Sequence, residues 1–161
     1  MKQVWTLVLT GGPCSGKTTG LATIEQELTN RGYYILIITE TATELISTGI
    51  RPFGNSLEVL PFQYLVFEKQ LHKEELYRKV ATMLSADKIV IIHDRGIIDN
   101  KSYVDNHQVE EAKKLDELSI SNWTGHPHFR IIDNSTNFED KIARLMNEVF
   151  AVLGEPIPRS Y

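Results

Sequence analysis

Four short apolar runs in the chain predict buried β-strands. They are rich in valine and isoleucine and do not alternate strictly between apolar and polar positions. Continuous apolar runs of this length are typical of parallel strands that are covered on both faces. The runs are VWTLVLT (4–10), YYILIIT (33–39), KIVIIH (88–93) and FRIID (129–133).

Helical periodicity fills the intervals between these runs. Apolar residues at positions 21, 24 and 28 recur at helical spacing, and Gly32 ends the pattern as a helix stop signal. The alternation of strands and helices predicts an α/β fold with three layers, in which helices cover both faces of a mostly parallel sheet. Further helices are predicted over residues 41–47, 59–84 with a break near Pro61, 109–121, and 138–153 with Gly154 and Pro156 as the stop.

The composition is that of an ordinary globular protein. The 161 residues are 42% hydrophobic and 24% charged, which suits a single domain spanning residues 1–161. A net charge of -4 without a basic stripe argues against a nucleic-acid partner. The single cysteine cannot form an internal disulfide, and no run approaches the roughly 20 apolar residues of a membrane span. We therefore expect a cytoplasmic protein.

The stretch LVLTGGPCSGKTTG, residues 7–20, indicates a phosphate-binding loop. Its positions 11, 16, 17 and 18 satisfy the pattern G-x-x-x-x-G-K-[ST] between a predicted strand and a predicted helix. The glycines let backbone N–H groups approach phosphate oxygens, and the amino end of the helix favours anions. Lys17 is predicted to reach the β- and γ-phosphates, and the Thr18 hydroxyl to bind Mg²⁺. We interpret Cys14 as a small filler and not as a nucleophile, since no base lies near it in sequence.

A second informative run, KIVIIHDRG, places His93, Asp94 and Arg95 at the carboxyl end of a predicted strand, where ligands bind in this fold class. Asp94 can hold Mg²⁺ through water or accept a proton from a substrate hydroxyl, and Arg95 can bind an anion. The alternative is a helix cap at Asp94 with Arg95 as its surface partner. His93 is more typical of a packed strand residue than of a catalyst. Hydrolytic motors usually carry Asp-Glu at this point, so the Asp-Arg pair favours a small-molecule kinase.

Other polar residues are weaker candidates for ligand binding. Glu40 follows the second predicted strand, where it either contacts metal-bound water or substrate or caps the next helix. Arg51 either binds substrate or is an exposed loop charge. Three residues share one face of a helix, which either lines an acceptor pocket or forms a polar, solvent-facing stripe; they are Gln63, Gln70 and Glu74.

Two features near the end of the chain complete the candidates. The H-x-H pair formed by His126 and His128 raises the question of a metal site, but no third ligand is evident in that stretch. Residues 133–136 form a turn-rich loop after the last predicted strand. We expect this loop to lie near the phosphate loop, where it can contact the nucleotide base.

These motifs together resemble a known family. The segments TGGPCSGKTTGLATIEQEL, ETATELISTGIRP, FQYLVFEKQLHKE, HDRGIID and WTGHPHFRIIDNSTNFEDKI are similar to the AAA_28 family of ATPase-like P-loop proteins. Its cores resemble nicotinamide riboside kinase and thymidylate kinases, so the resemblance implies a kinase-like P-loop NTPase fold. It implies that Asp94 and Arg95 act on acceptor or metal and that Glu40 is an acidic site residue. It also implies phosphate binding by Gly11, Gly12, Pro13, Cys14, Ser15, Gly16, Lys17, Thr18 and Thr19, and base contacts by Asn134, Ser135 and Thr136.

One part of the family pattern is absent. Relatives place a long segment between the positions equivalent to Tyr103 and Val109, with an Arg-bearing lid and a further strand beside the phosphate-loop strand. Here SYVDNHQVEEA runs directly across this point, which agrees with four predicted strands where the family has five. Two explanations stay open: a compact natural variant, or a natural protein with further residues here.

The sequence thus predicts a P-loop protein that binds ATP or GTP with Mg²⁺, held by Thr18 and Asp94, and leaves two functions open. The first is a kinase with Lys17, Asp94 and Arg95 as catalytic residues and a small nucleoside-like or nucleotide-like metabolite as acceptor. The second is a regulatory nucleotide-binding module, or slow NTPase, that acts through a partner. In the first case, substrate contacts are expected from Glu40, Arg51, Gln63 and Gln70.

Overall fold

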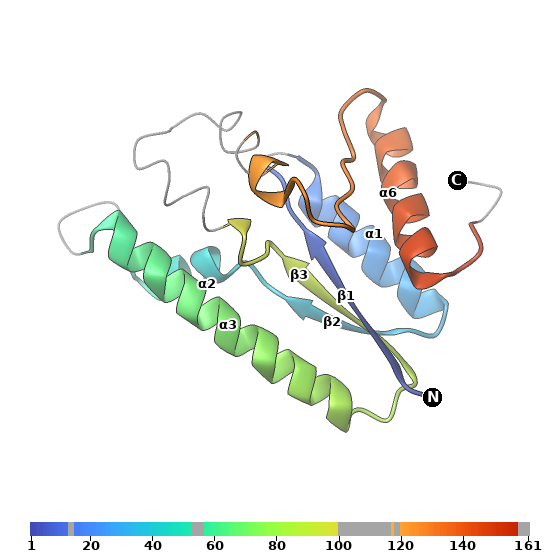
Figure 1. The fold of residues 1–161 in the computed structure, drawn as a ribbon, viewed down its shortest axis with the longest axis horizontal. Helices are drawn as coiled ribbons and strands as arrows, with labels where there is room; N and C mark the ends of the chain where they lie inside the picture. Colours follow the sequence, from blue (N-terminus) through green and yellow to red (C-terminus); the bar gives the residue numbers. More distant parts are fainter. Residues whose placement is uncertain (13–14, 53–56, 100–116, 118–119, 158–161) are drawn as a thin grey trace.

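A small parallel sheet with β3 in the middle forms the centre of the molecule (Figure 1). The computed structural model describes residues 1–12, 15–52, 57–99, 117 and 120–157. Its strands β1 (Gln3–Leu9), β2 (Tyr34–Ile38) and β3 (Lys88–Asp94) follow the order β1-β3-β2. Leu9 is in register with Asp94, and Ile38 with His93, so the three carboxyl ends meet at one edge. The first three predicted strands are confirmed.

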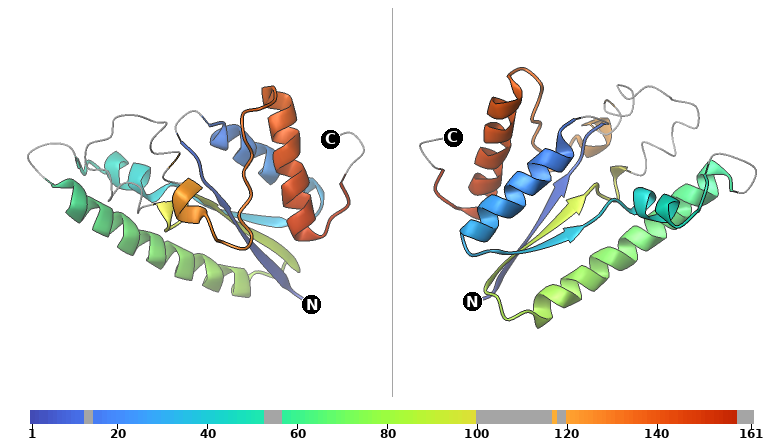
Figure 2. Two further views of the ribbon diagram at one scale, coloured as in Figure 1. Left: turned by 45° about the horizontal axis from the view of Figure 1, so that its top comes forward. Right: turned by 180° about the vertical axis from the view of Figure 1, so that it is seen from behind.

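Helices pack on both faces of this sheet. Helices α1 (Lys17–Asn30) and α6 (Phe138–Leu153) cover one face, and α3 (Val59–Met83) lies against the other, with the short α2 (Thr41–Ser47) beside it (Figures 1 and 2). The predicted α/β class with a parallel sheet is confirmed. The sharp end of α6 at Gly154 is also confirmed, because this glycine adopts the left-handed conformation of a helix C-cap, with φ of 69°.

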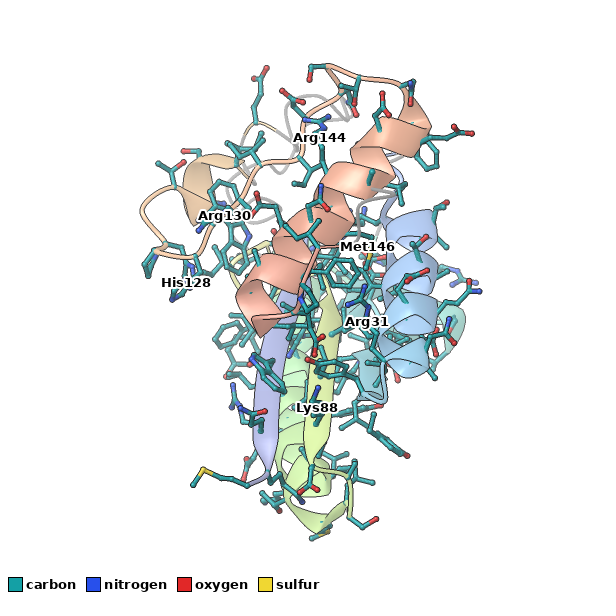
Figure 3. All side chains as sticks on the ribbon, turned by 90° about the vertical axis from the view of Figure 1, so that its right-hand side faces the viewer. Arg31, Lys88, His128, Arg130, Arg144 and Met146 are labelled. Carbon is teal, nitrogen blue, oxygen red and sulfur yellow. The ribbon has the colours of Figure 1, made fainter. Side chains whose placement is uncertain are left out.

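The strand β3 is buried on both faces, which explains its continuous apolar sequence. Val90 and Ile92 pack toward α1 and α6, whereas Ile89 and Ile91 pack toward α3, since successive strand side chains point to opposite faces. Met146 of α6 lies in the first of these clusters, between α6 and α1 (Figure 3). The predicted core of a sheet covered on both faces is therefore present around β3.

The break predicted near Pro61 is wrong, because α3 runs unbroken from Val59 to Met83. Pro61 lies in the first turn of this helix, after the N-cap Glu58. The backbone N–H groups of the first turn have no partner within a helix, so a proline there removes no hydrogen bond. The next residue, Phe62, already donates its backbone N–H to the carbonyl of Glu58.

The strand predicted over residues 129–133 is also wrong. These residues have no regular secondary structure, Ile131 is 57% exposed, and the Phe129 ring stacks on Trp123. Within the described residues no strand pairs with the outer edge of β1, so residues 129–133 do not extend the sheet there. The apolar side chains of Val4 and Val8 on β1 are correspondingly exposed. The junction between Tyr103 and Val109, and most of the helix predicted over 109–121, lie outside the described residues.

A charged cluster joins the end of the chain to the amino edge of the sheet. Glu155 accepts hydrogen bonds from the Tyr33 hydroxyl at 2.6 Å and from Lys88 Nζ at 3.0 Å. Arg31 lies 3.7 Å from the same carboxylate and covers the Phe150 ring (Figure 3). Burial and the bond to Glu155 raise the pKa of Tyr33 to about 12. The hydrogen bonds that Glu155 accepts from Tyr33 and Lys88 lower the pKa of Glu155.

We expect Glu155→Gln to lower the melting temperature, because charge-assisted hydrogen bonds contribute about 1.5–3 kcal/mol and about 1 kcal/mol corresponds to about 2–4 °C in a domain of this size. Since the folded state lowers the pKa of Glu155, its contribution is present above the unfolded pKa and is lost as the pH falls through the folded value. The difference in melting temperature between wild type and Glu155→Gln should therefore become smaller at acidic pH. Thermal unfolding between pH 3 and 7 measures it, with the exposed Glu25→Gln on α1 as control; equal stabilities of Glu155→Gln and wild type at neutral pH would contradict the expectation.

Candidate functional site

The carboxyl edge of the sheet gathers the main candidate residues. The loop after β1 leads into α1, Glu40 follows β2, and Asp94 ends β3. The charges of Arg95, Asp94 and Glu40 are close enough to Lys17 to act on its pKa. The structure thus brings Lys17, Asp94, Arg95 and Glu40 into one site.

The loop between β1 and α1 has a backbone that suits glycine. Gly11 and Gly16 have φ of 148° and 88°, and residues other than glycine rarely adopt these backbone angles. A Cβ at Gly11 would lie 2.9 Å from Ser15 Oγ, and a Cβ at Gly16 would lie 2.8 Å from the Phe138 ring. Gly16 is the N-cap of α1, so the free N–H groups of the first turn begin at this loop. The predicted residues Pro13 and Cys14 lie outside the described residues.

The Lys17 ammonium group lies over its own loop. Its Nζ donates to the carbonyl oxygens of Gly11 at 2.9 Å and Gly12 at 3.2 Å. Burial lowers the pKa of Lys17, and Arg95 adds to this effect, whereas Asp94, Glu40 and Asp99 oppose it. Neutral carbonyls are weaker partners for an ammonium group than phosphate oxygens are. Lys17 is therefore a preplaced cation with a stronger interaction to gain from an anion.

Asp94 offers an oxygen atom with no protein partner. Its Oδ1 is buried and has no hydrogen bond among the described residues. Burial raises the pKa of Asp94, and Glu40 adds to this effect, while Lys17 and Arg95 lower it. A turn over residues 95–98 follows Asp94 directly, so the interpretation as a helix cap does not apply. The carboxylate is thus a candidate ligand for a cation or a proton.

The residues present fit Mg²⁺. This ion prefers oxygen donors and keeps several waters while it contacts substrate phosphates. The unpartnered Asp94 oxygen and the exposed hydroxyl of Thr18, at the start of α1, are donors of this type. Within the described ranges no group of three or more His, Cys, Asp or Glu side chains could hold a metal ion, and this includes the exposed pair His126 and His128.

Arg95 adopts a strained backbone at the centre of the site. Its φ of 71° is in the left-handed region, which costs free energy for a residue with a side chain. Its backbone N–H donates to the Leu9 carbonyl at 2.9 Å, and its Nε lies 2.6 Å from Glu40 Oε1. Glu40 occupies the N-cap position of α2, but its side chain makes no capping bond and faces Arg95 instead. Glu40 is therefore an ion-pair partner of Arg95, whereas the helix-cap interpretation pairs Arg95 with Asp94.

Three polar residues of α3 point inward, namely Gln63, Gln70 and Glu74. Gln70 is 4% exposed, accepts a hydrogen bond from the Thr41 hydroxyl, and lies with its Nε2 3.4 Å from His93 Nδ1. Glu74 Oε1 lies 3.6 Å from the same ring nitrogen. Burial lowers the pKa of His93, and Glu74 opposes this. Gln63 is also buried, so the alternative of a solvent-facing stripe is wrong, and Gln70 and Glu74 tie α3 to α2 and β3.

The loop over residues 133–136 lies beside the phosphate loop, as expected. Lys141 Nζ donates to the Ser15 carbonyl at 2.7 Å and to Asn134 Oδ1 at 2.6 Å, which joins the two loops. Arg144 of α6 holds the start of the same loop through Asp133 Oδ1 at 2.7 Å (Figure 3). Bonds from Ser135 and Arg144 lower the pKa of Asp133 to about 2. Ser135 and Thr136 are exposed next to Asn134.

Arg51 lies near the end of α2, where it is exposed and donates to the Ile46 carbonyl at 2.9 Å. Sequence reasoning missed four residues that shape the site, namely Asp99, Trp123, Phe138 and Lys141. The one signal for Asp99 is its place in HDRGIID, close behind Asp94.

Comparison with known proteins identifies the family. A family model described as an AAA domain, AAA_28, matches residues 6–118, which is more than half of the chain. The chain therefore belongs to this family of P-loop NTPase-like proteins, for which nucleotide binding, usually with Mg²⁺, is implied. Neither a curated protein nor a solved structure matches the chain.

In the part of the chain that the structure describes, none of the helices combines the length and the apolar character needed to cross a membrane.

Proposed function

We propose that the chain is a phosphotransferase that binds ATP or GTP with Mg²⁺ and transfers the terminal phosphoryl group to a small nucleoside-like or nucleotide-like acceptor. The observation that carries this proposal is that Lys17, over the loop between β1 and α1, lies at the same edge of the sheet as Asp94 and Arg95. Asp94 is in register with Leu9 at the end of β1, and the Arg95 N–H donates to the Leu9 carbonyl. Phosphoryl transfer needs little covalent participation from the protein, so a pocket of fixed charges is the main requirement.

The phosphates would bind over the loop and the amino end of α1. Lys17 would exchange the carbonyls of Gly11 and Gly12 for β- and γ-phosphate oxygens. Bound Mg²⁺ supplies further positive charge to these oxygens, and Thr18 and Asp94 are the side chains that would hold it, directly or through water. The base would lie against the loop formed by Asn134, Ser135 and Thr136.

Asp94 and Arg95 would orient the acceptor. In the transfer, the acceptor hydroxyl oxygen forms a bond to the γ-phosphorus while the bond to the bridging oxygen breaks, which leaves a nucleoside diphosphate. Where Asp94 holds Mg²⁺ only through water, its carboxylate would accept the hydroxyl proton. Arg95 would bind an anionic or polar group of the acceptor, with Glu40 holding the guanidinium group in place.

A turnover assay tests this proposal. The full chain is incubated with ATP or GTP, Mg²⁺ and a panel of nucleosides and nucleoside monophosphates, and nucleoside diphosphate and phosphorylated acceptor are measured by chromatography and mass spectrometry. We expect turnover that depends on one class of acceptor and is lost in Lys17→Ala, the control for contaminating enzymes. Diphosphate formation that no acceptor changes would contradict the kinase.

A regulatory nucleotide-binding module is the second candidate. The observation in its favour is that the sequence SYVDNHQVEEA runs directly across the point where relatives place the lid and a further strand. A lid arginine can contribute about 10³-fold or more to the rate of phosphoryl transfer. Tight nucleotide binding without acceptor-dependent turnover would favour the module.

A further inference from the structure

Asp99 is a buried carboxylate that joins three separate parts of the chain. Its side chain is inaccessible to solvent, with 0% of the residue exposed. Its Oδ1 accepts hydrogen bonds from the Thr10 hydroxyl at 2.5 Å and from the Trp123 indole N–H at 2.9 Å. Its Oδ2 accepts the backbone N–H of Gly96 at 2.8 Å. A buried carboxylate needs such a set of donors, because it loses its hydration on folding.

The three donors come from three different segments of the chain, and two of these segments adjoin the candidate site. Thr10 is the last residue before Gly11, at which the phosphate loop begins. Gly96 follows Asp94 and Arg95 in the turn after β3. Trp123 begins the segment that leads to the loop over 133–136, and its ring packs against Gly96 so closely that a Cβ there would lie 2.9 Å from Trp123 Cζ2.

The turn that Asp99 holds is one that needs support. Arg95 is in the left-handed conformation, which a non-glycine residue keeps only when its surroundings fix it. On one side, the Arg95 N–H is bonded to the Leu9 carbonyl. On the other side, Gly96 is bonded to Asp99 through its N–H and through its carbonyl, which accepts the Asp99 N–H at 3.1 Å. Asp99 therefore fixes the turn over residues 95–98, which sets the position of Arg95 and of the neighbouring Asp94.

We propose that Asp99 is a positioning residue of the nucleotide site. Through its bonds to Gly96 and Thr10, it holds the turn over residues 95–98 and the start of the phosphate loop in one fixed arrangement. This inference rests on the proposed binding of a Mg²⁺-nucleotide and adds a residue that acts through others without touching the ligand. Its role requires a carboxylate, since only a group with two acceptor oxygens serves all three donors.

Asparagine separates this role from simple core packing. It has almost the shape of aspartate but replaces one acceptor oxygen by an NH₂ group, which donates only. With its oxygen toward Thr10 and Trp123, the amide NH₂ group faces the Gly96 N–H. With the amide reversed, the NH₂ group faces the Trp123 N–H. Either orientation keeps two of the three contacts, because the Thr10 hydroxyl can accept as well as donate, and leaves the N–H of Gly96 or of Trp123 unpaired. Asp99→Asn should therefore loosen the cluster that holds the turn over residues 95–98.

Nucleotide affinity with and without Mg²⁺ tests the proposal. Dissociation constants for non-hydrolysable ATP and GTP analogues are measured by calorimetry in Mg²⁺ and in EDTA, for wild type, Asp99→Asn and the control Tyr33→Phe. Tyr33→Phe also removes a hydrogen bond from a buried side chain, but at the opposite edge of the sheet. We expect Asp99→Asn to reduce the Mg²⁺-dependent gain in affinity roughly tenfold, with little change in EDTA. Tyr33→Phe should lower stability and leave this gain unchanged.

The outcomes distinguish this inference from the proposed function. Wild type that binds neither analogue overturns both. Wild type that binds with a Mg²⁺-dependent gain, together with an Asp99→Asn variant that is less stable but keeps the same gain, overturns the positioning role alone. If Asp99→Asn does not fold, Thr10→Val tests the proposal instead, because it removes only the hydroxyl next to the phosphate loop. Weaker nucleotide binding by Thr10→Val in EDTA supports the proposal. Wild-type affinity of this variant in both Mg²⁺ and EDTA overturns it.

Discussion

Lys17→Ala should lower the affinity for a Mg²⁺-nucleotide about 100-fold or more, because two hydrogen bonds to charged phosphate oxygens are each worth about 1.5–3 kcal/mol. The expected loss is large because Lys17 already lies over the loop, bonded to Gly11 and Gly12, and needs no rearrangement of α1 to reach a phosphate. The same substitution should change the stability of the unliganded protein little, because the Gly12 carbonyl keeps the hydrogen bond from the Ser15 N–H and the Gly11 carbonyl belongs to a partly exposed residue that can bond to water.

Calorimetric titration of wild type and Lys17→Ala with an ATP analogue measures the effect. Lys88→Ala is the matched control, since it removes the same charge at the opposite edge of the sheet, beside Glu155. This control should lose stability and retain nucleotide affinity. A Lys17→Ala variant that binds within threefold of wild type would show that the loop does not hold the phosphates through this residue.

Asp94→Asn should have opposite effects on function and on stability. It should abolish the Mg²⁺-dependent gain in nucleotide affinity and lower phosphoryl transfer about 10²–10⁴-fold, the range for loss of a general base. It should also raise the melting temperature of the unliganded protein by about 2–4 °C for each 1 kcal/mol gained. The reason is that the ionised Asp94 is partly buried with an unpartnered Oδ1. This arrangement leaves an oxygen for Mg²⁺ but lowers the stability of the unliganded protein.

The stability effect has a predicted pH dependence. The pKa of Asp94 is raised by burial and by Glu40 in the folded state. The stability linked to this shift is present below the unfolded pKa, about 3.9, and is lost as the pH rises through the folded pKa. The advantage of Asp94→Asn over wild type should therefore grow from acid to neutral pH. Thermal unfolding from pH 4 to 7 measures it, with the exposed Asp87→Asn as control; a variant less stable than wild type at pH 7 contradicts this account of Asp94.

The sequence predicted those parts of the fold that local pattern decides. The strands β1, β2 and β3 and the limits of α6 follow from continuous apolar runs, helical periodicity and a stop signal at Gly154. The segment over 129–133 has the same apolar character as a strand, but strand formation also needs hydrogen bonds to a neighbouring strand, and within the described residues this segment pairs with none. Pro61 shows the same limit, because its effect depends on its distance from the start of α3.

The candidate site was predictable only where its residues are adjacent in sequence. The loop around Lys17 and the pair Asp94 and Arg95 form short sequence motifs, and each motif by itself indicates a chemical role. Asp99 does not, because its donors come from positions 10, 96 and 123 and only the folded chain brings them together. The inward direction of Gln70 likewise depends on the packing of α3 on β3, since helical spacing alone does not say which face is buried.

The most direct test of the account is an equilibrium titration of the wild-type chain with non-hydrolysable ATP and GTP analogues, in Mg²⁺ and in EDTA. The account predicts saturable binding of one nucleotide per chain, strengthened by Mg²⁺ because Asp94 and Thr18 lie at the loop. Folded protein that shows no saturable binding of either analogue would contradict the central claim that this loop holds the phosphates of a nucleotide.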